Sequence, residues 1–372
     1  MQFIDLKTQQ MHIRDKLEKR INNVLNHGKY IMGPEVVELE GKLAEYVGIN
    51  HCISCSSGTD ALLIPLMAKG IGRGDAVLTT PFTYIATAEV IRLVGATPIF
   101  VDINPHTFNI NPALIPGAIK LSKQKGLKPK AIIPVDLFGL AAPYNEITEF
   151  TKEFNLFIIE DAAQGFGGVI KEKKAGSFGD VAATSFFPAK PLGCYGDGGA
   201  IFTNDEILVQ KMKSIRVHGG GIDKYDNVRL GLNGRLDTLQ AAILLEKLSI
   251  FPAEVVKRNE VAKYYSLNMP DYLKGPTVPK GYLSSWAQYS IMANSKIERD
   301  SIIEHLKAAD IPAMIYYSLP LHLQKVFSDL GYVKGDYPVS EDSADKIFSI
   351  PIHPYLEKKQ QDYVLEELKS FE

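Results

Sequence analysis

One lysine of the sequence has a setting suited to covalent chemistry. Lys190 stands between Pro188 and Pro191, after an apolar, strand-like run and before the glycine-rich stretch Gly196 to Gly199. A single lysine is usually a solvated surface charge, and that alternative applies here too. The two prolines, however, restrict the motion of this lysine and let it lose its water, as a lysine that forms a Schiff base must.

Two carboxylates, Glu160 and Asp161, follow the apolar run Phe157 to Ile159. A carboxylate at the end of a buried strand costs free energy unless it is paired. One interpretation is a cap, in which Asp161 begins the next helix. The other is a carboxylate that pairs with a protonated ring nitrogen.

Small residues from Ser56 to Asp60 lead into an apolar, helix-like stretch. Backbone N–H groups at such a helix start bind phosphate, although simple capping by Ser57 or Thr59 would use the same residues. The sequence lacks both G-x-x-x-x-G-K-[ST] and a G-x-G-x-x-G after the first strand, which disfavours P-loop hydrolases and dinucleotide dehydrogenases. A phosphate cradle, a strand-end carboxylate and a positioned lysine together describe a site for pyridoxal 5'-phosphate (PLP).

Short apolar runs alternate with amphipathic stretches over the first two-thirds of the chain. The strand-like runs are Ala76–Thr80, Pro98–Ile103, Ala131–Val135, Leu156–Ile159, Val181–Phe187 and Gly199–Thr203. The helix-like stretches are Glu35–Tyr46, Asp60–Ala68, Thr83–Leu93, Asn145–Glu153 and Ile207–Val217. This order predicts an α/β fold with a mostly parallel sheet that helices cover on both faces, and such sheets bind ligands at their strand ends.

The pattern changes after about residue 250. We therefore expect a large PLP-binding α/β domain over residues 1–250 and a smaller α+β domain over residues 251–372. The smaller domain is predicted from a helix at Ala253–Asn268, a strand at Trp286–Ala293, and helices at Ile297–Ala309 and Leu356–Ser370. The stretch Asp5 to Asn26 has helical periodicity, but the pattern does not decide where the first 30 or so residues pack.

The composition is that of an ordinary globular protein. The chain has 372 residues, of which 45% are hydrophobic and 23% charged, and a formal net charge of −2. So small a charge gives no electrostatic reason to expect nucleic acid or an anionic membrane as a partner. No apolar stretch approaches the roughly 20 residues of a membrane helix, and no secretion signal is visible.

The three cysteines do not form a disulfide framework. Cys52 and Cys55 spell C-x-x-C, which could be a redox pair or half of a zinc site, but no second such pair accompanies them. We favour the simpler interpretation of small apolar core residues in a buried strand. No metal is expected, and the reducing cytoplasm is the expected compartment.

The sequence resembles the sugar aminotransferases of the DegT/DnrJ/EryC1/StrS family across nearly its whole length. The resemblance rests on the motifs at residues 3–6, 33–35, 57–62, 81–84, 160–164, 193–200, 233–242 and 351–355. It implies the aspartate-aminotransferase fold (fold type I), with a seven-stranded, mostly parallel sheet in the large domain.

The resemblance also implies roles for individual residues. Lys190 would be the imine lysine, Asp161 would partner the pyridine nitrogen, and Gln164 would bond the ring hydroxyl oxygen. Tyr84 would stack on the ring. Gly58, Thr59 and Ser185 would hold the phosphate. Asn233 would reach the cofactor of a neighbouring subunit, which implies a homodimer, and Arg235 would bind the carboxylate of the amino donor, L-glutamate.

Within the family, the stretches 164–167 and 187–195 look most like enzymes that aminate C3 of a UDP-linked 3-keto-2-acetamido sugar. The substrate would be UDP-3-keto-N-acetylglucosamine or its uronate, used for cell-surface polysaccharide or lipopolysaccharide precursors. The uronate enzyme has His where Tyr316 stands here, which weakens the case for a uronate unless Arg235 or His322 supplies the charge. A dTDP-3-keto-6-deoxyhexose aminotransferase and a C4 nucleotide-sugar aminotransferase remain alternatives. A PLP-dependent sugar dehydratase is more remote, because those enzymes replace the lysine with histidine.

Overall fold

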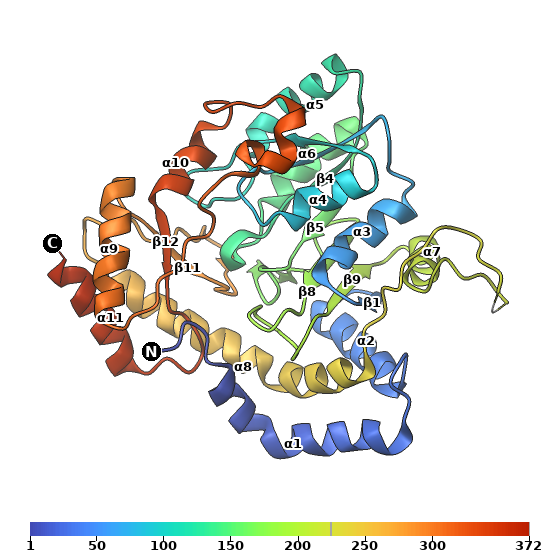
Figure 1. Cartoon of the computed structure of the whole chain (residues 1–372), viewed down its shortest axis with the longest axis horizontal. Coiled ribbons are helices and arrows are strands. Elements are labelled where there is room, and N and C mark those ends of the chain that lie inside the picture. The colour runs from blue at the N-terminus through green and yellow to red at the C-terminus, as the bar shows by residue number, and fades with distance from the viewer. Residues whose placement is uncertain (224, 372) are drawn as a thin grey trace.

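A seven-stranded sheet forms the centre of the computed structural model, which describes residues 1–223 and 225–371 (Figure 1). Its strands stand in the order β1-β9-β8-β5-β4-β2-β3. β9 is antiparallel to both of its neighbours, β1 and β8. All other neighbouring strands of the sheet are parallel to each other. The bounds are β1 His51–Cys55, β2 Asp75–Thr79, β3 Thr97–Phe100, β4 Lys128–Ile133, β5 Phe157–Asp161, β8 Val181–Ser185 and β9 Gly199–Thr203.

Alternating side chains of these strands enter two different cores. Ala131, Ile133 and Ile159 pack on the face covered by α3 (Gly58–Ala68), α4 (Ala86–Leu93) and α7 (Glu206–Arg216). Ile132 and Ile158 pack on the opposite face, against α5 (Ile115–Gln124) and α6 (Tyr144–Phe154). Burial on both faces is the reason that these strands are almost continuously apolar in sequence, as predicted.

α2 (Pro34–Val47) and α8 (Thr238–Asn268) cover the same face of the sheet as α5 and α6, at its β1 end. Cys52 and Cys55 lie in β1, and all three cysteines are buried and free. The C-x-x-C sequence is therefore part of a core strand. None of the helices in the described residues is long and apolar enough to cross a membrane.

α8 is a single helix of 31 residues with Pro252 inside it. The sequence pattern predicted a helix only from Ala253, because proline lacks an N–H and usually marks a helix start. Here the helix continues through the proline, with Phe251 in the core under the large sheet and Tyr265 in the core of the C-terminal part. The predicted boundary at residue 250 thus falls within this helix.

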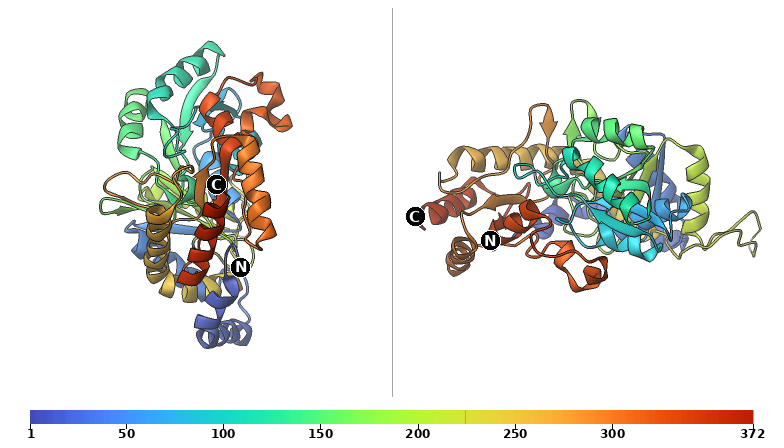
Figure 2. Two further views of the ribbon diagram at one scale, coloured as in Figure 1. Left: turned by 90° about the vertical axis from the view of Figure 1, so that its left-hand side faces the viewer. Right: turned by 90° about the horizontal axis from the view of Figure 1, so that it is seen from above.

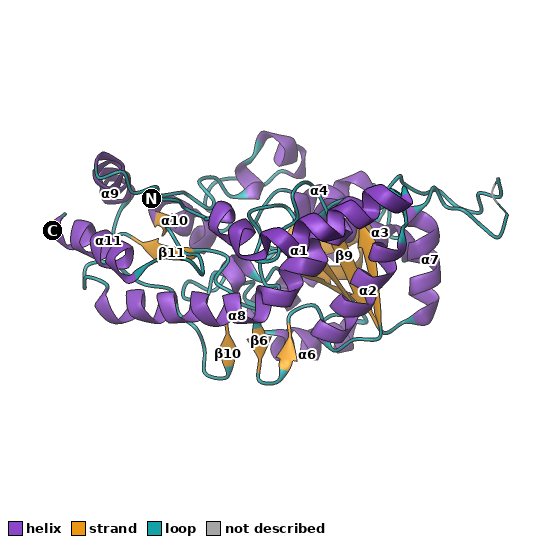
Figure 3. Cartoon of the chain, turned by 90° about the horizontal axis from the view of Figure 1, so that it is seen from below, coloured by secondary structure: helices purple, strands orange, loops and turns teal. Residues whose placement is uncertain are grey.

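The C-terminal part has its own small core around Tyr265 and Tyr289. Its antiparallel strands are β11 (Tyr289–Met292) and β12 (Ile347–Ile350), and its helices are α9 (Lys296–Ala308), α10 (Pro338–Lys346) and α11 (Lys358–Ser370). The sequence pattern predicted β11, α9 and α11 but not α10 or β12. A short sheet made of β6 (Val169–Ile170), β7 (Lys173–Lys174) and β10 (Tyr282–Leu283) connects the two parts beside α8 (Figure 3).

The N-terminal helix α1 (Leu6–His27) lies along α8 at one side of the molecule (Figure 1). Ile13, Leu17 and Val24 are its buried apolar residues. Arg20 Nε donates to Glu246 on α8 at 2.5 Å. Figure 2 shows that both termini lie at the end formed by the C-terminal part, where Met1 packs against its core.

Candidate active site

Lys190 lies in the turn that connects β8 with β9, at the carboxyl edge of β5 and β8. Its backbone N–H donates to the carbonyl of Phe187 at 2.9 Å, and Cys194 N–H donates to the carbonyl of Phe186 at 2.7 Å. These bonds fold the turn and hold the lysine beside the sheet. Burial lowers the pKa of Lys190, and the charge of Asp161 opposes that shift only in part. The amine is therefore easier to deprotonate than a surface lysine.

Asp161 is the last residue of β5 and is 4% exposed. Thr87 Oγ1 donates to Asp161 Oδ2 at 2.8 Å, and Ala163 N–H donates to Oδ1 at 3.2 Å. Burial raises the pKa of this carboxyl, whereas the two hydrogen bonds and Lys190 lower it. The structure therefore brings Lys190 and Asp161 into one electrostatic environment, with Thr87 of α4 as a partner that sequence reasoning did not identify.

The side chain of Gln164 is buried and fixed at both ends. Its Oε1 accepts from Phe138 N–H at 2.8 Å, and its Nε2 donates to the hydroxyl of Tyr317 at 3.0 Å. Because a backbone N–H requires an acceptor, the orientation of the amide is defined, and one Nε2–H is left for a ligand.

Tyr317 and Tyr84 stand next to this amide. The Tyr84 ring is 56% exposed, and its centroid lies 6.5 Å from that of Tyr317. Burial raises the pKa of Tyr317, so its hydroxyl stays protonated. Sequence reasoning did not identify Tyr317 as part of the site. The signal was present in the Tyr316–Tyr317 pair, but the pattern does not say which of the two faces Gln164.

A close approach of backbone to side chain forms the candidate phosphate cradle. Gly58 begins α3, and a Cβ on this glycine would lie 2.5 Å from Cβ of Ser185, the last residue of β8. Only glycine allows this contact. Ser57 Oγ accepts from Asp60 N–H at 3.0 Å, so Ser57 caps the helix. The structure therefore brings Gly58, Thr59 and Ser185 together at a helix N-terminus, a setting that suits a phosphate.

Asn233 and Arg235 lie on the outer side of this cradle. They line an open cleft of about 630 Å³ whose other lining residues are Ile31, Ser56, Ser57, Gly196, Asp197, Asp237 and Gln240. Arg235 Nε and Nη2 donate to Asn233 Oδ1 at 3.1 and 2.5 Å. Asn233 is exposed to solvent in the single chain.

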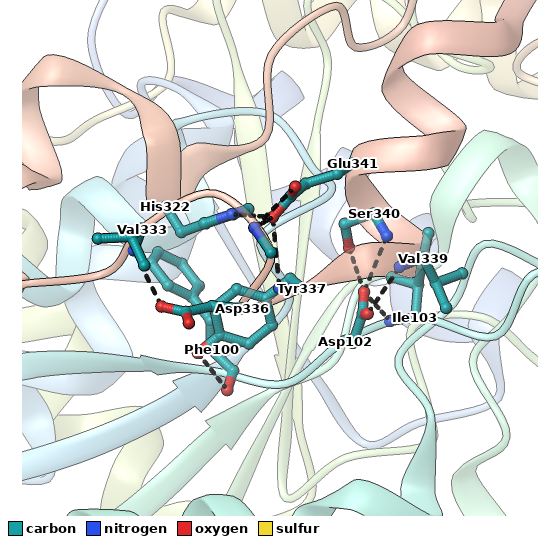
Figure 4. Close-up of polar contacts among 11 residues, drawn as sticks. Phe100, Asp102, Ile103, His322, Val333, Asp336, Tyr337, Val339, Ser340 and Glu341 are labelled. Atoms are coloured by element: carbon teal, nitrogen blue, oxygen red, sulfur yellow. Dashed lines mark hydrogen bonds and ion pairs between the residues drawn. The ribbon is translucent and has the colours of Figure 1, made fainter.

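The remaining two candidates, Tyr316 and His322, have different settings. The Tyr316 ring contacts Phe3 and Tyr317, at centroid distances of 6.4 and 5.9 Å. His322 is 1% exposed; its Nε2 lies 3.0 Å from Glu341 Oε1, and its ring contacts Tyr337 (Figure 4). The sequence pattern showed a histidine but not this partner. The structure therefore brings Tyr316 to the cluster around Gln164 and commits His322 to a contact with α10, so we do not include His322 in the site.

Comparison with known proteins shows that this chain is related to known enzymes over nearly its full length. The chain is 47% identical, over 96% of both chains, to the UDP-2-acetamido-2-deoxy-3-oxo-D-glucuronate aminotransferase of Pseudomonas aeruginosa. It is 37% identical to the UDP-N-acetyl-3-dehydro-alpha-D-glucosamine 3-aminotransferase of Acidithiobacillus ferrooxidans, over 96% of this chain and 94% of that one.

Solved structures have the same fold. A DegT DnrJ EryC1 StrS aminotransferase from Brucella abortus is 50% identical, with a TM-score of 0.97 over 100% of this chain and 99% of that one. NtdA from Bacillus subtilis, determined with bound cofactor PMP, is 28% identical, with a TM-score of 0.89 over 99% of this chain and 83% of that one. Residues 11–369 match the DegT/DnrJ/EryC1/StrS aminotransferase family as a whole. The chain therefore belongs to the DegT/DnrJ/EryC1/StrS aminotransferase family, and its fold is the α/β fold of these enzymes.

Proposed function

We propose that this protein is a PLP-dependent aminotransferase that moves the amino group of L-glutamate to the C3 keto group of a UDP-linked 3-keto-2-acetamido sugar. The observation that carries the proposal is the convergence of Lys190, Asp161 and Gln164 at one edge of the sheet, next to the cradle of Gly58 and Ser185. Two relatives named as 3-oxo and 3-dehydro UDP-sugar aminotransferases support the substrate class.

The donor set fits the cofactor. Gly58 lets the start of α3 approach Ser185 closely, so that both could contact the phosphate. The Asp161 carboxyl can hold a proton on the ring nitrogen, and the unused Nε2–H of Gln164 can donate to the ring hydroxyl oxygen. Tyr84 would cover the ring face. When bound, PLP supplies an electron sink for the carbon that loses its proton.

Lys190 would move the proton. Burial lowers the pKa of this amine, so its Nζ is available in the neutral form as a base for the α-proton of glutamate. The same Nζ, once protonated, can return a proton in the next step. Burial raises the pKa of Asp161, and the hydrogen bonds from Thr87 and Ala163 oppose part of that rise and so favour the charged form that would face the ring nitrogen. Arg235 would bind the carboxylate of glutamate through its guanidinium fork.

The proposed assembly is a homodimer with shared active sites. Asn233 is exposed beside the 630 Å³ cleft, where it could reach the cofactor phosphate of a partner subunit. The segment between α7 and α8 extends away from the body of the chain, and two of its apolar residues, Ile222 and Leu230, are 100% and 88% exposed (Figure 1). Exposed apolar side chains of this kind favour a protein partner.

Tyr316 bears on the choice between the uncharged sugar and its uronate. Its ring contacts Tyr317, which holds Gln164, so a substrate bound at this site would pass close to it. A tyrosine supplies a hydroxyl but no positive charge. We therefore expect UDP-3-keto-N-acetylglucosamine to be at least as good a substrate as the uronate.

The test is turnover with L-glutamate and a panel of keto sugars, measured as release of 2-oxoglutarate. The panel contains UDP-3-keto-N-acetylglucosamine, its uronate, a dTDP-3-keto-6-deoxyhexose and a UDP-4-keto sugar, with Lys190→Ala as the control. We expect turnover of the UDP-3-keto sugars. Turnover of only the 4-keto sugar, or of only the dTDP sugar, would overturn the assignment of the acceptor. Absence of any turnover would overturn the proposed reaction.

A further inference from the structure

Two carboxyl groups that the proposed reaction does not use meet inside the large domain. Asp136 follows β4, and Glu160 precedes Asp161 on β5; neither side chain is exposed to solvent. Asp136 N–H donates to the backbone carbonyl of Asp161 at 3.0 Å. Because neighbouring residues of a strand face opposite sides, Glu160 lies on the other face of β5 from Asp161.

The hydrogen bonds of this pair define where a proton must lie. Glu160 Oε1 and Oε2 accept from Gly176 N–H at 2.5 Å and from Phe178 N–H at 2.7 Å. Asp136 Oδ1 accepts from Ala142 N–H at 2.8 Å and from the Tyr144 hydroxyl at 2.9 Å. Asp136 Oδ2 is buried and receives no N–H or O–H donor from the described residues, and the side chain that it faces for a hydrogen bond is the second carboxyl group, that of Glu160.

Two carboxylates cannot make that bond without a hydrogen between them. We propose that Asp136 is a neutral acid that donates from Oδ2 to an ionised Glu160, and that Asp136 thereby positions Gln164 for the cofactor. Asp136 is a positioning residue in this account, since it acts through its neighbours. The second half of the proposal rests on the proposed function, in which Gln164 donates to the ring hydroxyl oxygen.

The connection to Gln164 is short and tightly packed. The loop that Asp136 anchors through Ala142 and Tyr144 carries Phe138, whose N–H orients the Gln164 amide. Directly after Gln164, a Cβ on Gly165 would lie 2.3 Å from Cβ of Asp136. A shift of Asp136 therefore displaces both the donor to Gln164 Oε1 and the backbone that carries Gln164.

Among the described residues, the groups that act most strongly on the pair include no positive charge to favour a second ionised carboxyl. The titratable groups that interact with the pair are Tyr144 of α6 and Tyr282 of β10, and Asp161 of β5 interacts in turn with Tyr144. Burial raises the pKa of Asp136 well above its usual range and raises that of Glu160 to about 7. These shifts agree with one proton retained by the pair at neutral pH.

The first experiment compares Asp136→Asn with Glu160→Gln by urea unfolding of the full chain without cofactor, from pH 5 to 8. Asparagine can replace a neutral acid, since its oxygen accepts from Ala142 and Tyr144 and its amide donates to Glu160. Glutamine cannot replace an ionised Glu160, because its NH₂ would face the N–H of Gly176 or Phe178. We expect D136N to unfold close to the wild-type urea midpoint at pH 6 and E160Q to be strongly destabilised or unfolded.

The pH dependence has a defined sign. The folded pair holds a proton that the unfolded chain releases at about pH 4, so the wild-type folding equilibrium constant falls as pH rises, by up to tenfold per pH unit until the folded pair titrates. D136N has no such proton, and its dependence should be flatter. If D136N and the wild type have the same pH dependence, or if D136N is as unstable as E160Q, the shared proton is refuted.

A second measurement tests the link to Gln164 with the PLP-loaded enzyme. Asp136→Ala removes the anchors to Ala142 and Tyr144, so we expect weaker PLP affinity and a shifted visible absorption band, both restored by Asp136→Asn. A wild-type band and affinity in D136A would refute the positioning role. The unfolding experiment needs neither cofactor nor substrate, so its outcome is independent of whether the proposed function is correct.

Discussion

Replacing Asp161 by asparagine tests the electrostatic part of the proposed function with little change of shape. The amide oxygen of the new side chain can still accept from Ala163 N–H, which lies 3.2 Å from Oδ1 in the wild type. On the other side, the Thr87 hydroxyl can turn to accept from the new amide NH₂ and donate to Thr83, whose Oγ1 is 3.2 Å away. Burial already disfavours the charge of Asp161, so its removal should not destabilise the cofactor-free fold.

The expected loss is therefore in catalysis. A buried, preorganised charge that faces developing charge contributes about 2.7–4 kcal/mol to transition-state stabilisation, so we expect kcat to fall by roughly 10²–10³. Single-turnover release of 2-oxoglutarate from PLP-loaded enzyme measures this loss, and a urea midpoint near that of the wild type is the control for folding. Thr87→Val, which removes one donor and keeps the charge, should lose far less. Activity of D161N within twofold of the wild type would show that the carboxylate does not serve the ring nitrogen.

Three further predictions address the other parts of the site. Lys190→Ala should fold and lose nearly all transamination, and borohydride treatment of the wild type followed by peptide mapping should label Lys190; a label on another lysine would contradict the assignment. Mixing Asn233→Ala with Lys190→Ala subunits should restore part of the activity, because one of the two mixed sites contains neither change if the sites are shared; a fully active monomer in sedimentation would contradict this. Tyr316→His should raise kcat/KM for the uronate relative to the uncharged sugar by roughly tenfold or more, since a charge-assisted contact is worth about 1.5–3 kcal/mol; an unchanged ratio in direct competition would exclude this residue as the determinant.

The fold and the residues that lie on regular elements were predictable from the sequence. The predicted runs Leu156–Ile159 and Val181–Phe187 contain most of β5 and β8, which the structure places side by side and parallel. Parallel strands bring their carboxyl ends to one edge of the sheet. The setting of Lys190 between prolines was equally visible in sequence. The pattern missed α5 in the large domain, α10 and β12 in the C-terminal part, and the two-residue strands β6, β7 and β10. In the C-terminal part, no regular alternation of strands and helices indicates the missing elements.

Contacts between distant segments could not be predicted. Thr87 and Tyr317 reach Asp161 and Gln164 from elements far away in sequence, and neither residue type marks such a role. His322 looked available for a substrate because its partner, Glu341, stands on a helix that the pattern did not show. Asp136 likewise gave no sign that its neighbour in space is a second carboxylate.

The continuity of α8 has a geometric consequence for how this protein can change over time. Since a helix advances about 100° per residue, one inserted or deleted residue near Pro252 would turn the whole C-terminal part by that angle about the helix axis. Tyr316 comes from the C-terminal part and Lys190 from the turn between β8 and β9, so such a rotation would separate the two walls of the site. The number of residues in α8 between Phe251 and Tyr265 therefore sets the angle at which the C-terminal part meets the sheet that carries the site.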